Sequence, residues 1–475
     1  MNREQLGGWD TEEIAAELEG SALTGPWNQL TDTAGDEAAW LLREVCRIQP
    51  PARIRELRNL EIEQNQRGAG FYGMLPDQVP EDLDAPVDIN ASLTVACRLA
   101  EIRKANLDAL RNTMPQYALE FTGEGVDHAE HLPLPDDWKL DLDVEGFRAL
   151  LDALGNPNLD TAEATRVAGM PAFTEMLRHR RELGYVPEPL IDEEGLAWCI
   201  VGATSQDSIH VLWRWLHPQN LFDLADVARF RDAYRRLLDR ITSDHGGVAH
   251  RVLSRIADFV PETTTFRDRL SFSVGWGIRG WATNETGGVN LEHIKDDDSN
   301  LLTMLVHETF HRLQIQLCPS DPTSDAQGFE QITSDGRLDG PQKQLYQALC
   351  YIMLEGSATY VSDPIVQEAW QDNARTSLDL LDRILHAEAD EAEELMTVGL
   401  RSNGPFYGFG ALLSSIHREH RGTKEVGHAL QHGAPTFVGE GLRHLKGTGL
   451  EASAEVSVAI DTLQRTLRPS PGEAL

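Results

Sequence analysis

The sequence has no long apolar run and comparatively few basic residues, and these absences exclude whole classes of function. No stretch approaches the roughly 18 consecutive apolar residues that a membrane-spanning helix needs. The 475 residues include 42 Lys and Arg against 76 Asp and Glu, which gives a formal net charge of −34. Because this charge repels polyanions, we expect no nucleic-acid partner and no binding to an anionic membrane surface.

Cysteine is also scarce and shows no pattern. The five cysteines are odd in number, widely spaced, and include no CxxC pair. We therefore expect buried thiols in a reducing compartment and no disulfide framework. The first residues lack the apolar segment of a signal peptide, so we expect a cytoplasmic location.

Helical periodicity dominates the residues that are present. Residues 91–121 and 225–260 carry apolar side chains at spacings of three and four, with a break expected at Pro115. Residues 268–276 and 287–294 alternate as two short strands, which we predict to be antiparallel. The sequence thus predicts an α+β fold that is predominantly helical, with a small sheet next to the helix that follows it.

A proline-bearing acidic stretch at 183–195 divides the chain. Since such stretches are typical of linkers, we place a domain boundary near residue 185. This gives a helical N-terminal region, 1–185, of unknown role, and a C-terminal domain, 186–475, which contains the chemistry.

The pattern HExxH occurs at residues 307–311 within an apolar, helical run. On a helix, His307 and His311 lie on one face and can bind one ion, while Glu308 can reach a water that the ion activates. Zinc lowers the pKa of such a water to about 7, and the carboxylate takes its proton as the water attacks a carbonyl group. The alternative is a helical face with satisfied polar groups or a degenerate site.

The third protein ligand must come from further along the chain. In the extended motif HExxHxxGxxH, Gln314 and Leu317 occupy the positions of the glycine and the third histidine. Residues 344–362 predict a nearly uncharged helix in which Glu355 is the single carboxylate, and a buried carboxylate needs a partner. We therefore favour Glu355 as the third zinc ligand. The alternative is a core carboxylate paired with an arginine such as Arg312.

A glycine-bearing strand is followed by HETFH, then by LEGSATY and then by NGPFYGFGALLSSIHREHRG. This succession of segments resembles the gluzincin group of zinc peptidases. Within that group the sequence is most similar to a bacterial family of uncharacterised zinc-dependent peptidases. The resemblance covers roughly residues 245–445. It implies a zincin-like domain in which His307, His311 and Glu355 bind zinc and Glu308 is the general base.

In zincins, a strand edge beside the active-site helix binds an extended substrate by adding it as a further strand. Residues 287–294 are our candidate for that strand, and Gly287 and Gly288 would leave room for the substrate. A plain hairpin turn is the alternative.

The donor that stabilises the oxyanion is harder to identify. Tyr407 is framed by Gly404, Gly408 and Gly410, which permit close approach of the backbone, so it is our first candidate. Tyr360 is the second. For either residue, the alternative is a tyrosine that only fills the core. Other histidine pairs are more typical of solvated helix faces than of a second metal site: His417 with His420, and His428 with His432.

Taken together, these patterns predict a cytoplasmic, Zn²⁺-dependent hydrolase that cleaves amide bonds in a peptide or small amide substrate. Two alternatives remain open. One is a small-molecule metallohydrolase of a biosynthetic pathway. The other is a non-catalytic regulatory protein with a zincin-derived fold, although the intact HExxH motif disfavours it.

Overall fold

The structure is a computed structural model, and it describes residues 9–47, 89–113, 134–156, 158–183, 193–203, 211–212, 224–274, 280–283, 285–291, 298–317, 336–364, 369–400 and 404–467. By its contacts the chain divides into two compact units. The first unit comprises Met1–Pro115 and Ala149–Arg231, and the second comprises Gln116–Arg148 and Asp232–Leu475. The boundary predicted near residue 185 lies outside the described residues, so the predicted domain limits stay a prediction.

The first unit is helical in the residues described. Helices α2 and α3 pack against the long helix α5, and α7 packs against α9. The predicted helix that begins near residue 91 is confirmed as α5, described over Ile89–Thr113, and the break predicted at Pro115 lies outside the described residues. The helices are α1 (Thr11–Leu18), α2 (Thr24–Ala34), the 3₁₀ helix η2 (Gly35–Glu37), α3 (Ala38–Arg47), α5 (Ile89–Thr113), α6 (Glu145–Ala153, which belongs to this unit from Ala149 on), α7 (Thr161–Ala168), α8 (Pro171–Leu183), α9 (Glu193–Gly202) and α11 (Leu224–Arg229).

The second unit combines one sheet with a larger number of helices, so the predicted α+β, mainly helical fold is confirmed. Its elements are β1 (Lys139–Asp143), α12 (Arg231–Ser243), α13 (His245–Ala257), β2 (Arg267–Ser273), β3 (Gly280–Ala282), β4 (Gly287–Asn290), α14 (Asp298–Leu317), α16 (Gly340–Ser362), α17 (Ala369–His386), α18 (Ala389–Leu400), α19 (Pro405–Arg421), α20 (Glu425–Gln431), α21 (Ala434–His444) and α22 (Ala454–Thr466). Across the described parts of both units, no helix is long and apolar enough to cross a membrane.

The four strands form one mixed sheet in the order β1-β2-β4-β3. Strand β2 pairs in parallel with both β1 and β4, and β3 pairs with β4 antiparallel. The prediction that the two sequence-predicted strands, now β2 and β4, are antiparallel was wrong. Their connection contains β3, which forms a hairpin with β4 that is closed by the Thr283 amide donating to the Thr286 carbonyl at 2.7 Å. The chain therefore reverses twice between β2 and β4 and leaves them parallel.

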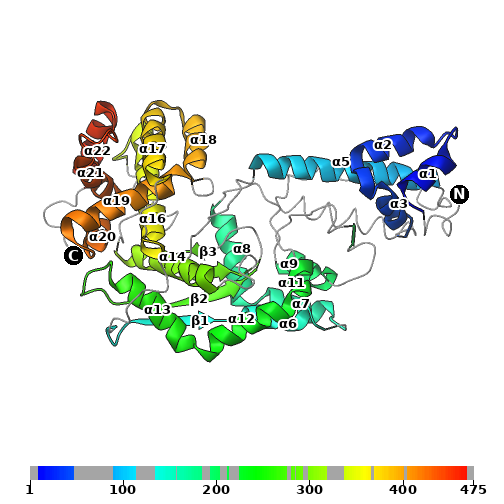
Figure 1. The fold of residues 1–475 in the computed structure, drawn as a ribbon, viewed down its shortest axis with the longest axis horizontal. Coiled ribbons are helices and arrows are strands. Elements are labelled where there is room, and N and C mark those ends of the chain that lie inside the picture. The colour runs from blue at the N-terminus through cyan, green and yellow to red at the C-terminus, as the bar shows by residue number, and fades with distance from the viewer. Residues whose placement is uncertain are drawn as a thin grey trace. The chain divides into compact units, whose positions relative to one another are not determined.

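Helix α14, which carries the HExxH motif, packs against β3 and β4 on one side and against α16 on another (Figure 1). The predicted helix around Glu355 is confirmed as α16. It begins after Asp339, whose side chain accepts a hydrogen bond from the backbone N–H of Gln342. In return, the side-chain oxygen of Gln342 accepts a hydrogen bond from the backbone N–H of Asp339. Such a reciprocal capping box satisfies backbone donors at the start of a helix. The contact between α14 and α16 therefore brings His307 and His311 of the first helix close to Glu355 of the second.

Helices α16 and α19 approach so closely that glycine is required on both (Figure 1). A Cβ atom at Gly356 would lie 2.2 Å from Cα of Gly410, and one at Gly410 would lie 1.8 Å from the carbonyl oxygen of Ile352. These neighbours are backbone atoms, so a side chain could be accommodated only by moving a helix. The small face of α16 at Gly356 thus lies against α19, whereas Ser357 contacts α14.

We expect Gly410→Ala to destabilise the protein by roughly 1–3 kcal/mol, the range for overpacking a well-packed interior. Gly246, near the start of α13, is the matched control, because a Cβ atom there would meet nothing within 4 Å. Gly246→Ala should cause no loss of stability, since alanine favours helices more than glycine. Urea unfolding of both variants tests this, and equal stability of Gly410→Ala and wild type would contradict the packing argument.

Candidate metal centre

Helix α14 directs two pairs of side chains in two directions. His307 and His311, one turn apart, lie on the face that meets α16. Glu308 and Arg312, each the next residue along, contact glycines of the sheet. Residues four apart share a helix face, so this division follows directly from the spacing of the motif. His307, Glu308 and Arg312 are all buried, and His311 is partly buried.

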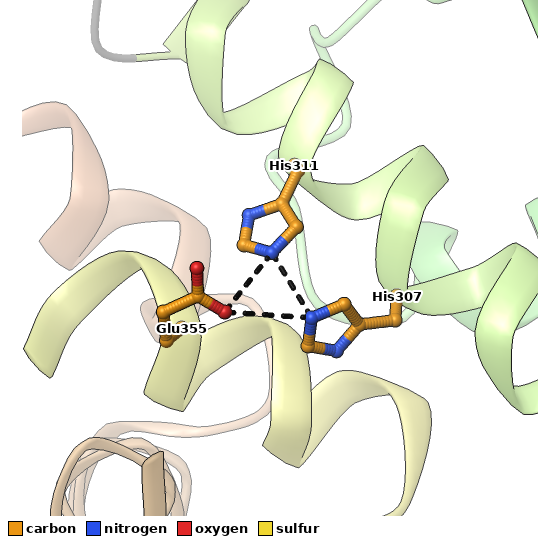
Figure 2. A group of neighbouring side chains, drawn as sticks. All are labelled: His307, His311 and Glu355. Carbon is orange, nitrogen blue, oxygen red and sulfur yellow. Dashed lines mark hydrogen bonds and ion pairs between the residues drawn. The ribbon is translucent and has the colours of Figure 1, made fainter. Parts of the chain in front are cut away.

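Two imidazoles and one carboxylate converge at the contact between α14 and α16. Nε2 of His307 lies 3.0 Å from Nε2 of His311. Oε2 of Glu355 lies 3.6 Å from the first nitrogen and 3.4 Å from the second. Figure 2 shows the three side chains pointing at one another from the two helices. One ligand atom from each of the three lies within 4.8 Å of the others, an arrangement that can hold a metal ion.

Glu308 stands beside this group without being one of its three members. Its carboxylate packs over Gly280 of β3, where a Cβ atom would lie 2.3 Å from Cδ of Glu308. Glycine at this position is therefore what makes room for the carboxylate. Burial raises the pKa of Glu308 to about 8, because a charged carboxylate loses hydration in this position.

Arg312 forms an ion pair with Asp268 and not with Glu355, which was the alternative partner left open by the sequence analysis. Its Nε donates to Oδ2 of Asp268 in β2 at 2.6 Å, and its Nη1 donates to the Thr283 carbonyl. Both side chains of the ion pair are buried. Arg312 thus joins α14 to the sheet, and Glu355 faces the two histidines.

The charges within the group favour a cation at its centre. Burial opposes a charge on His311, but the Glu355 carboxylate outweighs burial and raises the pKa of that imidazole to about 9. Burial likewise opposes ionisation of Glu355, yet the imidazoles, His311 first, hold the pKa of its carboxyl well below the ordinary value. Burial lowers the pKa of His307. The point where the three donor atoms face one another therefore attracts positive charge, as a proton or as a metal ion.

This donor set fits zinc. Catalytic zinc sites commonly use three protein ligands of the imidazole and carboxylate types, and two histidines with one glutamate are a known combination. The donors come from two helices, α14 and α16, and their mutual distances are short enough for one ion to reach all three.

Residues 204–396 match the model of a family described as "Putative zinc dependent peptidase (DUF5700)". The match confirms the predicted resemblance to a family of uncharacterised zinc-dependent peptidases and agrees with zinc as the cofactor. It includes all three members of the group and Glu308, and ends before Tyr407. No curated protein and no solved structure matches the chain.

The two tyrosines proposed as oxyanion donors lie in different surroundings. Tyr360 is fully buried between Phe259 and Trp370, and its hydroxyl accepts from Nη1 of Arg418 at 3.2 Å. Its environment is that of a core residue. Tyr407 is partly exposed in the first turn of α19, and its role stays a prediction.

The other candidate histidines form no second metal group in the described part of the chain, where only the group of His307, His311 and Glu355 is found. His417 is buried, and its Nε2 lies 2.9 Å from the Phe437 carbonyl oxygen. His420 stacks instead on His444, with ring centroids 4.0 Å apart.

Sequence reasoning missed three residues that shape the centre. Gly280 makes room for Glu308, and Asp268 binds Arg312. Gln314, read only as a departure from the extended zinc motif, lies 2.7 Å from His311 through its Oε1 atom. A buried amide one turn after a ligand was a signal that could have found Gln314. Nothing local in the sequence points to the other two.

We expect the purified protein to bind about one zinc per chain, and His311→Ala or Glu355→Ala to remove most of it, because each change leaves only two ligands. His420→Ala, at an exposed histidine outside the group, is the control and should retain the metal. Elemental analysis after dialysis measures the content. Full zinc retention in both ligand variants would overturn the assignment.

Proposed function

We propose that the second unit is a zinc-dependent peptidase of the gluzincin type, with His307, His311 and Glu355 as zinc ligands and Glu308 as general base. The observation that carries this proposal is the convergence of the three donor atoms beside a fourth, buried acidic group that is not among them. A purely structural metal site has no need of the additional carboxylate, whereas hydrolysis requires a base at this position. The family match supports the same reaction class.

Zinc in such a site acts as a Lewis acid and lowers the pKa of water, so that a nucleophile forms near neutral pH. The chain supplies the proton transfers. Glu308 accepts a proton from the attacking water and passes it to the leaving amine. Burial raises the pKa of Glu308 above that of an ordinary carboxyl group, which makes its carboxylate a stronger base for the first of these steps.

The sheet favours an extended peptide as substrate. In the described chain β4 is paired on both sides, so the role predicted for its edge is corrected to β3, the last strand in the sheet order. Gly280 of β3 lies directly under Glu308. A peptide that adds to the outer edge of β3 as a further strand would therefore run past the base.

The remaining parts of the proposal come from composition. We propose a cytoplasmic protein that binds neither nucleic acid nor membrane, in keeping with its net charge of −34. None of the four cysteines in the described ranges is in a disulfide, which agrees with a reducing compartment. A small amide is the alternative to a peptide as substrate.

Zinc-loaded wild-type protein should cleave members of a peptide library, and Glu308→Gln should lower turnover by roughly 10²–10⁴-fold, because the amide keeps the shape but cannot accept the proton. Zinc content should not change, since Glu308 is not a ligand. Glu262→Gln, at an exposed glutamate of the same unit, is the matched control and should keep full activity.

Mass spectrometry of the library, run in parallel with a panel of small amides, measures the outcome. Cleavage of small amides alone would replace the peptidase proposal with a small-molecule hydrolase. Unchanged turnover in Glu308→Gln would show that another group is the base.

Tyr407 is our proposed oxyanion donor. It lies one turn before Gly410 in α19, the residue that contacts α16 at Gly356, next to Glu355. Residues three apart lie close together on a helix surface, so we propose that the ring lies near the side of α19 that meets the metal-binding helix. Its partial exposure also suits a side chain at a substrate site better than one in the core.

Tyr407→Phe should lower kcat and kcat/KM equally, by roughly 10²–10³-fold, because the phenol would bind only the charge that develops in the transition state. Tyr360→Phe is the matched core control. It removes a hydroxyl that binds Arg418, so the free energy of unfolding should fall by about 1 kcal/mol and Tm should fall with it. The kcat of this variant should stay unchanged. If Tyr407→Phe behaves like Tyr360→Phe, Tyr407 belongs to the scaffold.

A further inference from the structure

Gln314 connects a metal-binding histidine to the helix that carries the third ligand. It is a buried residue on α14, three positions after His311. Its Oε1 lies 2.7 Å from Nδ1 of His311. Its Nε2 donates to the Leu354 carbonyl at 2.8 Å and to Oγ of Ser357 at 2.7 Å, both on α16.

These contacts decide which way the amide points. The carbonyl oxygen of Leu354 can only accept a hydrogen bond, so the amide nitrogen must face α16. Ser357 uses its own hydroxyl hydrogen to bind the Met353 carbonyl at 2.6 Å, and its oxygen is left to accept from Gln314. The amide oxygen of Gln314 therefore faces His311.

The orientation of the amide in turn decides where His311 carries its proton. An amide oxygen is an acceptor, so Nδ1 of His311 must be the donor. The reverse arrangement would set two lone pairs against each other at 2.7 Å. In the neutral imidazole the other nitrogen, Nε2, then keeps its lone pair, and this is the atom that faces His307 and Glu355.

The same side chain also holds the two helices in register. Leu354 immediately precedes Glu355, and Ser357 follows it by two residues. Gln314 therefore donates hydrogen bonds to α16 both before and after the third ligand in the sequence. Partners that bind the second nitrogen of a ligating histidine fix its orientation and raise metal affinity. A neutral amide can accept from the histidine and donate to α16 at once. An ionised carboxylate can only accept.

We infer that Gln314 is a positioning residue, which holds His311 with Nε2 free for metal and couples it to the Glu355 helix. This inference rests on the metal site of the proposed function. It gives a role to the residue that stands where the extended zinc motif has glycine.

The test uses the full chain and three variants. Gln314→Leu removes both functions of the amide, and Gln314→Glu keeps an acceptor for His311. Gln464→Leu is the control, because Gln464 also bridges two helices of this unit, donating from α22 to the Pro435 carbonyl of α21 at 2.7 Å, outside the metal group. Zinc affinity is measured by competition with a chelator. The His311 Nδ1–H proton is followed by NMR on protein with ¹⁵N-labelled histidine, assigned by its absence in His311→Ala.

We expect zinc to bind roughly 10–100-fold more weakly to Gln314→Leu than to wild type, the usual effect of losing such a partner. The slowly exchanging Nδ1–H signal should be present in wild type and lost in this variant. Gln314→Glu should restore that signal and most of the affinity. Gln464→Leu should lower Tm and leave both readouts unchanged.

Zinc affinity within twofold of wild type in Gln314→Leu, or an unchanged Nδ1–H signal in that variant, would overturn the inference while leaving the metal site intact. A wild-type chain that binds no zinc would overturn the metal site and the role of Gln314 in it. The two failures are distinguishable because the Nδ1–H signal is observed with and without metal.

Discussion

The metal group depends on α14 being packed at short range between the sheet and α16. On the sheet side, Gly280 has no side chain and Glu308 occupies the space above it. On the other side, α16 is held by α19 through two glycines in backbone contact, Gly356 and Gly410. Protein interiors are packed as densely as organic crystals, so a carbon added at Gly356 or Gly410 would force α16 or α19 to move, and one added at Gly280 would displace the Glu308 carboxylate. The spacing of the donors is thus a property of the packing as much as of the motif.

Electrostatics add direction to this packing. The buried pair of Arg312 and Asp268 joins α14 to β2. Such a pair contributes little net stability, because desolvation offsets the attraction, but it penalises arrangements in which one partner is left alone. Rotation or sliding of α14 would separate the pair, and would at the same time move His307 and His311 away from Glu355. The register of the helix and the geometry of the metal group are therefore tied together.

The features that were predictable from the sequence are local ones. The HExxH spacing places two imidazoles on one helix face whatever the fold, and Glu355 is conspicuous because its helix has no other carboxylate. Both predictions needed only helical geometry and the cost of an unpaired charge. The mainly helical character followed in the same way from periodicity, and the structure confirms it.

The features that were missed depend on contacts between remote segments. Strand β1, with the sequence KLDLD, has little intrinsic preference for a strand and exists as one because it pairs with β2. The parallel pairing of β2 and β4 was hidden by the three-residue strand β3. Gln314 looked like a defect in a motif, since its partners Leu354 and Ser357 lie on another helix. In each case the residue's role is defined by a neighbour that sequence spacing does not identify.

The pairing of β1 with β2 also makes the second unit discontinuous along the chain. The chain leaves this unit after Arg148, contributes Ala149–Arg231 to the first unit, and returns at Asp232. During synthesis β1 therefore emerges long before its partner strand, and the second segment of the first unit is translated in between. Contacts so distant in sequence slow folding, because the intervening chain must be ordered or looped out before the strands meet. The sheet beneath the metal centre can therefore be completed only after β4 has been translated, and the ligands acquire their fixed spacing only after α16 has followed, when most of the polypeptide exists.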